Sequence, residues 1–561
     1  MTTRFRRAAG LILAVALAVP AGTVAARPRP APVEDDEARI VHALNRLTFG
    51  PRPGDVEAVR KIGLEEWISR QLHPERIPDE ALGPRLAPLS TLGLSTAEIL
   101  RGYDPPPALK KEIQKRRAEM GESASEEDMR KMQRELAAEY KDQMAGPPRK
   151  VVEDLQQAKL LRAIYSERQT GEVLVDFWMN HFNVFADKGQ DKFLLTAYER
   201  DVVRPHAWGR FEDLLRATAQ SPAMLFYLDN WLSTDPSANA DDLRRAMAEE
   251  NGMRPRRGNG MGRGLGRRRA PGAMARPPQA GGAKRKAGLN ENYAREIMEL
   301  HTLGVDGGYT QKDVTELARC LTGWTIVGLR QNNPRFVFLD AAHDHGDKVV
   351  LGRRIKSSGI KEGEQMIHIL ATHPATAHFI SYKLARRFVA DEPPAALVDR
   401  AAAVFRKTDG DIREVVRAIV TSPEFSAPEY RQAKVKTPLE FVVSAVRASG
   451  AEVRDASALA QRVAQMGMPL YQQQPPTGYK DTAEAWVSTS GLLARLNFAL
   501  DLAGGRLRGV AVTADGIAAE RLVPAGLSDT TRRTLASESG QGLDPARMAG
   551  LILGSPEFQR R

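Results

Sequence analysis

Imidazole and carboxylate side chains in two runs of this sequence are suited to acid–base chemistry. His181 follows Asn180 in the first run, and Glu296 and Glu299 lie three residues apart in the second, residues 290–301. Both kinds of side chain transfer protons near neutral pH, and both bind divalent metal ions. We therefore expect a polar cleft in which these groups activate water.

The second run predicts a helix with one polar face. Asn290 suits the N-cap position, and at about 100° per residue four polar side chains fall within about 100° of one another. These four candidates for catalysis are Asn292, Arg295, Glu296 and Glu299. Arg295 would hold an anionic substrate group, and Asn180 or Asn292 would orient it. The alternative is an Arg–Glu network that stabilises a helix surface or a helix interface.

His181 is the fifth candidate for catalysis, and it also lies on an apolar stripe. It follows Phe177 and Trp178 at helical spacing, while Asn180 lies on the polar side. Two interpretations are open. The ring is either a hydrogen-bonded core histidine, or it faces Glu296 at the mouth of a polar cleft.

His343 and His345 are candidates for metal binding. Their spacing of two residues puts both imidazoles on one side of an extended segment. A divalent metal ion is the cofactor that such a site would hold, and the full set of candidate ligands is His181, Glu296, His343 and His345. With Gly346 following, the segment also suits a simple turn.

A shared site would require segments far apart in the sequence to meet. We expect at least two of the three segments, those of His181, Glu296 and His345, to place polar side chains in one pocket. His181 and Glu296 are the pair we expect to lie closest, because proton transfer and metal binding both need atoms within a few ångströms.

Other chemistry finds no support in the sequence. It has no G-x-x-x-x-G-K-[ST] run for binding phosphate and no G-x-S-x-G run for a serine hydrolase. The single cysteine, Cys320, cannot form a disulfide within the chain, and its helical apolar neighbours predict a buried side chain. Glu296 and Glu299 point the same way from one helix, so they are poorly placed to flank a glycosidic bond.

The first 26 residues have the parts of a secretory signal peptide. Basic residues precede an apolar run at positions 8–19, and small residues follow up to Ala26. The apolar run is shorter than the roughly 20 residues that span a bilayer, and no later stretch is longer. We expect an extracytoplasmic protein, periplasmic or secreted, without a transmembrane segment after cleavage.

The net charge of +11 comes from one segment of the chain. Residues 251–288 contain eleven of the 81 Lys+Arg and no acidic residue, so the remaining basic residues equal the 70 Asp+Glu in number. The charge therefore does not indicate specific nucleic-acid binding. Because this Gly/Pro/Arg-rich composition offers little to bury, we expect residues 235–288 to be disordered. Residues 251–288 would bind polyanions or, alternatively, form a solvated loop without a function.

Helical periodicity dominates the rest of the chain. Apolar residues repeat every three to four positions, for example at Val314, Leu317 and Leu321. Strand-like alternation is confined to residues 335–339 and 348–351, which we predict to form one β-hairpin. The fold class predicted is mostly α, with irregular packed helical hairpins and one small β-hairpin.

The same pattern suggests how the chain is divided. A main helical domain would span residues 36–505, and residues 506–561 would form a C-terminal helical segment. Within the main domain, residues 107–145 are highly charged and have little apolar stripe. We expect them to form helices that project from the body.

Several motifs in the sequence resemble those of a bacterial family catalogued as domain of unknown function 1800. They are Asp176-Phe-Trp-Met-Asn-His-Phe-Asn183, Tyr227-Leu-Asp-Asn230, Asn290 to Trp324, His343-Asp-His-Gly-Asp-Lys348 and Lys383-Leu-Ala-Arg-Arg-Phe388. The resemblance implies a secreted, largely helical protein whose relatives are commonly encoded beside a second exported family of unknown function. It implies no activity.

Two functions are compatible with these observations. The first is an extracytoplasmic hydrolytic enzyme with a His/Glu/Asp cleft, with or without a divalent metal ion. The second is a non-catalytic binding or assembly module that works with a second exported protein encoded nearby.

Overall fold

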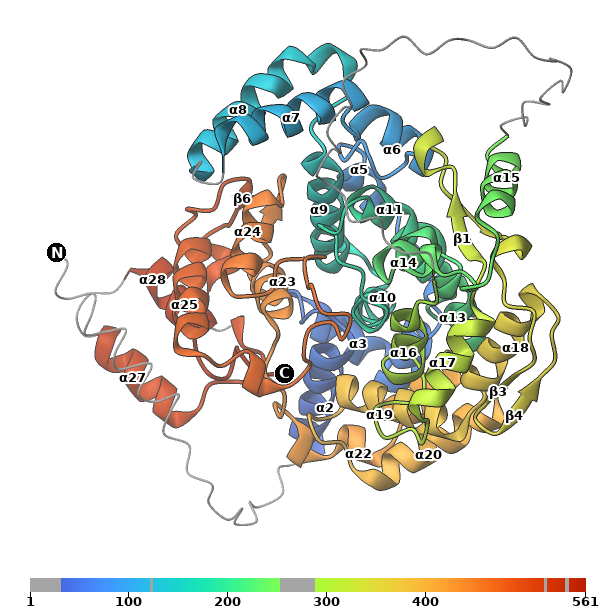
Figure 1. The fold of residues 1–561 in the computed structure, drawn as a ribbon. Helices are drawn as coiled ribbons and strands as arrows, with labels where there is room; N and C mark the ends of the chain where they lie inside the picture. Colours follow the sequence, from blue (N-terminus) through green and yellow to red (C-terminus); the bar gives the residue numbers. More distant parts are fainter. Residues whose placement is uncertain (1–31, 122–124, 253–287, 519–521, 540–543) are drawn as a thin grey trace, which may run out of the picture.

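The computed structural model describes residues 32–121, 125–252, 288–518, 522–539 and 544–561 (Figure 1). Helices make up 60% of the structure, and the described residues contain only three sheets, each of two antiparallel strands. The prediction of a mostly α-helical fold is therefore confirmed. The expected signal peptide lies outside the described residues and stays a prediction.

The helices of the first part of the chain, up to residue 252, are short to medium in length. They are α2 (Pro32–Leu47), α3 (Asp55–Ile62), α4 (Leu64–Gln71), α5 (Leu82–Leu86), α6 (Thr96–Tyr103), α7 (Pro107–Met120), α8 (Glu126–Glu139), α9 (Arg149–Tyr165), α10 (Gln169–His181), α11 (Asp191–Ala197), α12 (Arg204–His206), α13 (Phe211–Ala219), α14 (Pro222–Tyr227) and α15 (Ala240–Glu250).

The second part, from residue 288, adds further helices and all six strands of the described chain. The helices are α16 (Glu291–Glu299), α17 (Gln311–Cys320), α18 (Ile360–Ala371), α19 (Pro374–Phe388), α20 (Ala395–Lys407), α21 (Ile412–Val420), α22 (Pro423–Ser426), α23 (Pro438–Ala448), α24 (Ser457–Gln465), α25 (Thr489–Ala503), α27 (Asp529–Ser539) and α28 (Pro545–Leu553). The strands are β1 (Trp324–Val327), β2 (Arg335–Phe338), β3 (Lys348–Val350), β4 (Arg353–Ile355), β5 (Glu452–Val453) and β6 (Val510–Ala511).

Side-chain caps fix where several helices begin. Thr310 and Asp313 form a reciprocal capping box at α17. At α22, the Ser422 hydroxyl accepts a hydrogen bond from the backbone N–H of Phe425 at 3.1 Å, and Pro423 occupies the first helical position. Local sequence thus determines where these two helices begin, independently of tertiary contacts.

The predicted hairpin of residues 335–351 is wrong in its pairing. β2 pairs with β1, and β3 pairs with β4, so the two expected strands belong to different sheets. The cause is the turn at Leu351 and Gly352, where φ is 50° and 71°. Two successive positive φ values are typical of the tight type I′ turn, which pairs Val350 with Arg353 directly.

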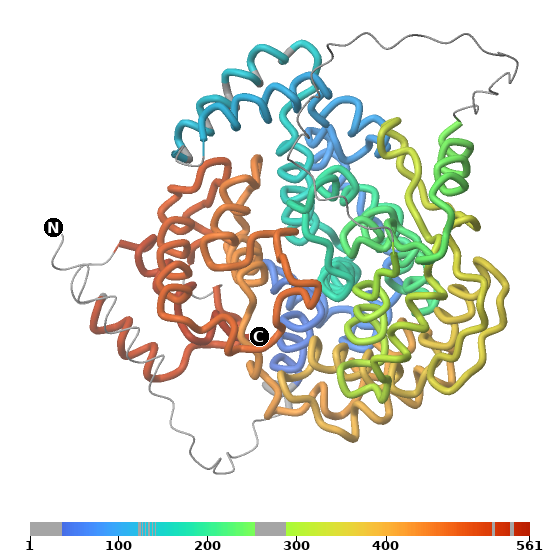
Figure 2. The backbone as a smooth tube through the Cα atoms, viewed as in Figure 1, coloured from blue at the N-terminus to red at the C-terminus, as the bar shows by residue number. Residues whose placement is uncertain are grey.

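One apolar core joins the helices from α2 to α28. Buried side chains from Ala43 to Phe558 belong to one contiguous cluster. Helices α9 and α10 lie in the middle of the molecule, between the C-terminal helices on one side and the strands β1 to β4 on the other (Figures 1 and 2).

Residues 506–561, which we expected to form a C-terminal helical segment, pack against the rest of the chain. Helix α28 packs along α25, and the ring of Phe558 lies edge-on to that of Phe441 at 6.0 Å. Arg561 reaches the same region, because its Nη2 lies 3.1 Å from Oε1 of Glu440. Residues 506–561 therefore complete the main core.

Two charged segments take different forms. In the stretch 107–145, α7 and α8 pack on each other through a small cluster of their own that contains Leu109, Met132 and Leu136, at one edge of the molecule (Figure 1).

The expectation of disorder across residues 235–288 is wrong for α15. That helix begins at Asn239, whose side chain caps it. Residues 253–287 lie outside the described part, so that part of the expectation is untested.

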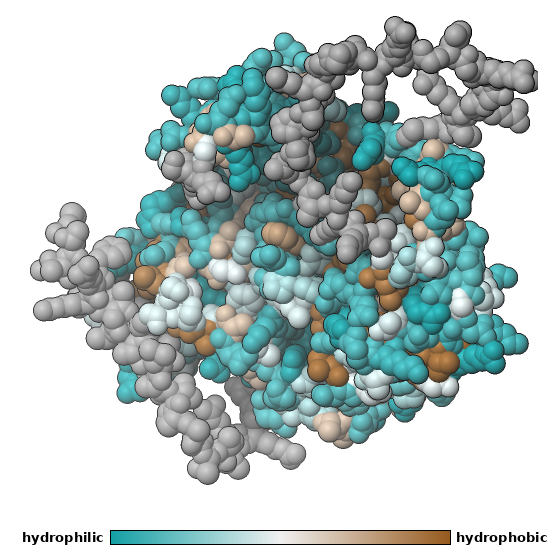
Figure 3. Space-filling view, viewed as in Figure 1, coloured by the Kyte–Doolittle hydropathy of each residue, from teal (hydrophilic) through white to brown (hydrophobic). Residues whose placement is uncertain are grey.

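The surface shown in Figure 3 is mostly hydrophilic, and its apolar residues form separate patches. Among the described helices, none combines the length and the apolar character needed to cross a membrane.

Candidate functional site

His181 lies at the C-terminal end of α10, buried among aromatic side chains. Its ring stacks on Phe177 with the centroids 6.2 Å apart and lies edge-on to Trp178 at 5.5 Å. Its Nε2 lies 3.1 Å from the carbonyl oxygen of His301, and its Nδ1 lies 2.8 Å from Nζ of Lys383. Because a carbonyl oxygen only accepts, Nε2 carries the ring proton and Nδ1 accepts a hydrogen bond from the lysine.

Lys383, on α19, brings an amine into the site without a negative partner. No carboxylate oxygen of a described residue lies within 4.0 Å of Nζ. Burial and the charge of Arg386 lower the pKa of the Lys383 amine to about 8, although Asp481 acts in the opposite direction. Burial, with Lys383 nearby, also holds the pKa of His181 well below its ordinary value. Both groups are therefore neutral in weakly alkaline solution.

Lys383 was not among the residues that the sequence predicted. The sequence nevertheless indicates that Lys383 is partly buried. Lys383 follows Phe379 by four residues and Ile380 by three, and so lies beside the apolar stripe of its helix. A lysine in such a position carries its amine into the interior unless the stem extends to solvent. That rule could have identified it.

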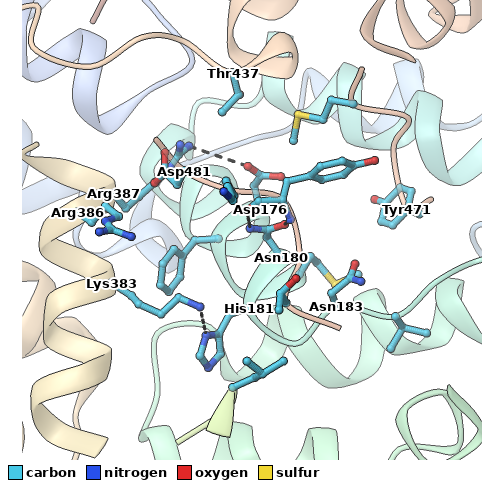
Figure 4. Close-up of a pocket in the computed structure, with 18 of the residues that line it drawn as sticks. Asp176, Asn180, His181, Asn183, Lys383, Arg386, Arg387, Thr437, Tyr471 and Asp481 are labelled. Carbon is cyan, nitrogen blue, oxygen red and sulfur yellow. Dashed lines mark hydrogen bonds and ion pairs between the residues drawn. The ribbon is translucent and has the colours of Figure 1, made fainter. Parts of the chain in front are cut away.

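A cavity of about 340 Å³ lies against this pair (Figure 4). Its walls come from α10, α19, the end of α16 and residues 468–481. Aromatic rings line much of it, namely those of Phe177, Phe379, Tyr382, Tyr471 and Tyr479. The volume and the mixed apolar and polar lining are typical of a site for a small molecule.

The polar side of α10 holds residues 473–479 in place. Asn180 donates from Nδ2 to the carbonyl oxygen of Tyr479 at 2.8 Å and accepts from its N–H at 2.7 Å. Asn183 donates to the carbonyl oxygens of Gln473 and Pro475 at 2.9 and 3.0 Å. Asn180, expected to orient a substrate, and Asn183 instead position one wall of the cavity.

Gly478 permits this close approach between segment and helix. Its φ is +70°, and a Cβ at this position would lie 2.2 Å from the carbonyl oxygen of Asn180. Only glycine fits without displacing α10 or the segment.

Basic residues outnumber acidic ones around the cavity. The basic residues are Lys159, Lys383, Arg386, Arg387 and Lys480, and the acidic ones are Asp176, Glu299 and Asp481. Some are paired, since Nζ of Lys159 lies 2.6 Å from Oδ1 of Asp176 and Arg387 contacts Glu440. The guanidinium of Arg386 is engaged on one side. Its Nε donates to the carbonyl oxygen of Asp391, and its Nη2 donates to the hydroxyl of Tyr382 and lies 3.6 Å from Oε1 of Glu392. Its Nη1 has no hydrogen-bond partner among the described residues.

The predicted pair of His181 and Glu296 is not the one that forms. Glu299, one turn further along α16, lines the cavity and accepts a hydrogen bond from the hydroxyl of Tyr309 at 2.8 Å. Glu296 is absent from the lining, although burial and the charge of Glu299 raise its pKa. Two of the three predicted segments therefore meet in one cavity, through His181 and Glu299.

The other two residues on the predicted polar face of α16 lie outside the cavity. Asn292 is exposed, and Arg295 donates to the side chain of Gln311 at 2.7 Å. Arg295 also lies 3.9 Å from Glu291. These contacts match the surface network that was the alternative interpretation.

His343 and His345 do not reach the cavity. His343 is buried, and its Nε2 lies 3.0 Å from Oε1 of Glu362, which also pairs with Lys348 at 2.5 Å. His345 is exposed and lies 3.8 Å from Asp340. The reason is the strand pairing, because the loop before β3 packs against α17 and α18 rather than against α10.

The predicted metal ligands are therefore not brought together. His181 and Glu296 do not share the cavity, and the two later histidines belong to other clusters. In the part of the chain that the structure describes, no group of three or more His, Cys, Asp or Glu side chains is arranged to hold a metal ion.

Comparison with known proteins identifies one family. The family described as "Protein of unknown function (DUF1800)" matches residues 42–560, which is nearly the whole chain. No curated protein and no solved structure matches the chain.

Proposed function

The chain belongs to the DUF1800 family, and we propose that it is an enzyme that hydrolyses a small anionic substrate by acid–base chemistry. One observation carries the proposal. The amine of Lys383 has no carboxylate partner among the described residues, bonds to Nδ1 of His181 at 2.8 Å and lies at the wall of a cavity large enough for a small molecule.

Lys383 would act as the proton acceptor. The neutral amine takes a proton from a water molecule as the water oxygen attacks the electrophilic atom of the substrate, and the resulting ammonium returns the proton to the leaving group. His181 acts as a positioning residue. Because its Nε2 is fixed by the carbonyl oxygen of His301, its Nδ1 stays directed at the amine.

The charges of the cavity support an anionic substrate. Arg386 lies three residues after Lys383 on α19, so both side chains leave the same face of the helix. The Nη1 group of Arg386 has no partner among the described residues, and the side chain is 28% exposed, so it is accessible to a ligand. A guanidinium in this state is suited to binding a carboxylate or phosphate.

Location and partners belong to the same proposal. Export rests on the pattern of residues 1–26, polyanion binding rests on the basic composition of residues 251–288, and an exported partner rests on the family resemblance.

The experiment is a screen of the mature protein against anionic esters, amides and phosphoesters, with two variants. Lys383→Met keeps the length of the side chain but removes the amine. Lys407→Met, at the exposed end of α20 and outside the cavity, is the matched control. We expect Lys383→Met to lower turnover by about 100-fold or more and Lys407→Met by less than about threefold.

The pH profile is part of the same test. Because the base must be neutral, the rate should rise with pH and level off above about 8. Equal rates in wild type and Lys383→Met for every substrate turned over, or no turnover at all, would favour the non-catalytic binding module instead.

A further inference from the structure

We propose that Lys383 is also a nucleophile that forms a Schiff base with small carbonyl compounds that carry an anionic group, the class of 2-oxo acids. The inference rests on the proposed function, because both need a neutral amine facing the cavity. It goes further in naming the chemistry of the ligand and a covalent bond.

The contacts of Lys383 distinguish it from other buried lysines. Lys434 lies 2.6 Å from Asp391, and Lys348 lies 2.5 Å from Glu362. Each of these two amines is held in an ion pair by a carboxylate. Lys383 instead donates to Nδ1 of an imidazole and faces the cavity.

Lys436 is a buried lysine that lacks a cavity for a ligand, which makes it a useful comparison with Lys383. It is also buried without a carboxylate within 4.0 Å among the described residues, it lies over the ring of Phe558 at 4.0 Å, and its pKa is lowered to about 7. The cavity beside it has a volume of only about 20 Å³. Lys436 thus has a similar amine with no room for a ligand, which makes it an internal control.

Arg386 accounts for the anionic group on the ligand. A second cation close to a lysine favours the neutral amine and is a known way to activate a lysine nucleophile. The same guanidinium can bind a carboxylate while the amine attacks the neighbouring carbonyl carbon, since the two side chains lie one turn apart on α19.

His181 positions the amine for the attack. The amine nitrogen attacks the carbonyl carbon, and the electrons of the C=O double bond move to the oxygen. The two amine protons pass one after the other through solvent water to that oxygen. The oxygen leaves as water while nitrogen and carbon form the imine double bond. One amine and one carbonyl give one imine and one water, with no oxidant or reductant.

The test is reductive trapping with pyruvate as the probe. The mature protein is incubated with pyruvate at pH 7.5 and treated with sodium borohydride, which delivers hydride to the imine carbon, and the modified lysines are identified by peptide mass spectrometry. At this pH an amine with a pKa of about 8 is neutral in about a quarter of molecules, against about one in a thousand for an ordinary lysine. We expect the adduct at Lys383 to exceed that at any other lysine by at least about tenfold.

Controls separate the features that the inference uses. Arg386→Gln should lower trapping of both probes, because loss of its charge raises the pKa of the Lys383 amine. It should lower trapping of pyruvate several-fold more than trapping of acetone, which has no carboxylate. Lys436 should stay unmodified in the folded protein. An adduct at Lys383 no greater than at Lys480 would overturn the inference, and so would equal trapping at Lys436. Failure of trapping with turnover that still depends on Lys383 would reject only the Schiff base, whereas failure of both would reject the proposed function as well.

Discussion

The chemistry of the cavity depends on which group lies next to His181. A carboxylate there would make the imidazole a stronger base and favour its protonated form. Lys383 does the opposite, because two neighbouring basic groups cannot both carry a proton at low cost in a buried site. The pair therefore has a neutral amine as its reactive member and a neutral imidazole as its support.

The role of His181 as a positioning residue can be tested by two substitutions. In His181→Gln, the amide can donate to the carbonyl oxygen of His301 and accept from Lys383, whereas His181→Phe can do neither. We expect trapping and turnover to fall by about tenfold or more in the Phe variant and by less than about threefold in the Gln variant. Both variants need a cooperative unfolding transition, checked by circular dichroism. Equal losses would show that the hydrogen bonds of His181 do not matter.

Lys383 should also make stability depend on pH. Its pKa is 10.5 when unfolded and about 8 when folded, so the unfolded state binds more protons between these values. The cost of burying the amine is therefore fully present below pH 8 and disappears as pH rises towards 10.5. Relative to wild type, Lys383→Met should be more stable at pH 7 than at pH 10.5, by up to about 3 kcal/mol. Urea unfolding at both pH values measures this difference, and a difference that does not change with pH would contradict it.

The sequence could identify part of the site and not the rest, for physical reasons. His181 and the polar side of its helix follow from helical periodicity. The partner of His181 depends on the packing of α10 against α19, two helices separated by nearly 200 residues, which no local pattern specifies. Glu299 and Glu296 share one helical face, so periodicity alone could not tell which of them reaches the cavity.

At the scale of elements, polar contacts decide which segment faces the cavity. Asn180 on α10 and Asn183 just after this helix fix the backbone of residues 473–479, and this wall then positions Tyr479. Local geometry likewise decides the strand pairing. The alternation of residues 335–339 and 348–351 predicts two strands, but the tight turn at Leu351 and Gly352 pairs β3 with β4, so β2 pairs with β1.

Asn180→Ala tests how this wall is held. The substitution leaves the N–H and carbonyl groups of Tyr479 without their partners, so we expect a loss of about 1–3 kcal/mol in the free energy of unfolding. Hydrogen exchange at Tyr479 should become faster. Gln472→Ala is the control, because it removes one exposed hydrogen bond to Asp187 and should cost less than about 0.5 kcal/mol. Unchanged exchange at Tyr479 would show that other contacts hold the segment.

At the scale of the whole molecule, one core reaches from α2 to the end of the chain. The sequence predicted a main domain of residues 36–505 followed by a C-terminal helical segment. In the structure, α28 buries its apolar face against α25 and Phe558 reaches Phe441. Residues 506–561 should therefore unfold together with the rest.

A pair of glycines in helices tests this shared core. In Gly550→Ala, the added Cβ would lie 2.9 Å from Cα of Leu500, so α28 must move away from α25. We expect a loss of about 1–3 kcal/mol in a single unfolding transition. Gly83→Ala, in α5, meets nothing within 4 Å and should stabilise the protein by about 0.4–1 kcal/mol. If Gly550→Ala instead showed an additional unfolding transition before an unchanged main transition, residues 506–561 would be a separately folding unit.

The central claim is that the fold holds Lys383 as a neutral amine at the wall of the cavity. The most direct measurement is the rate of acetylation of Lys383 as a function of pH, in the folded mature protein, by competitive labelling with acetic anhydride against N-acetyl-lysine amide. Peptide mass spectrometry reports each lysine separately. The structure predicts half-maximal reactivity of Lys383 at a pH of about 8. Reactivity that follows the reference amine, with half-maximal labelling near pH 10.4, would contradict the account.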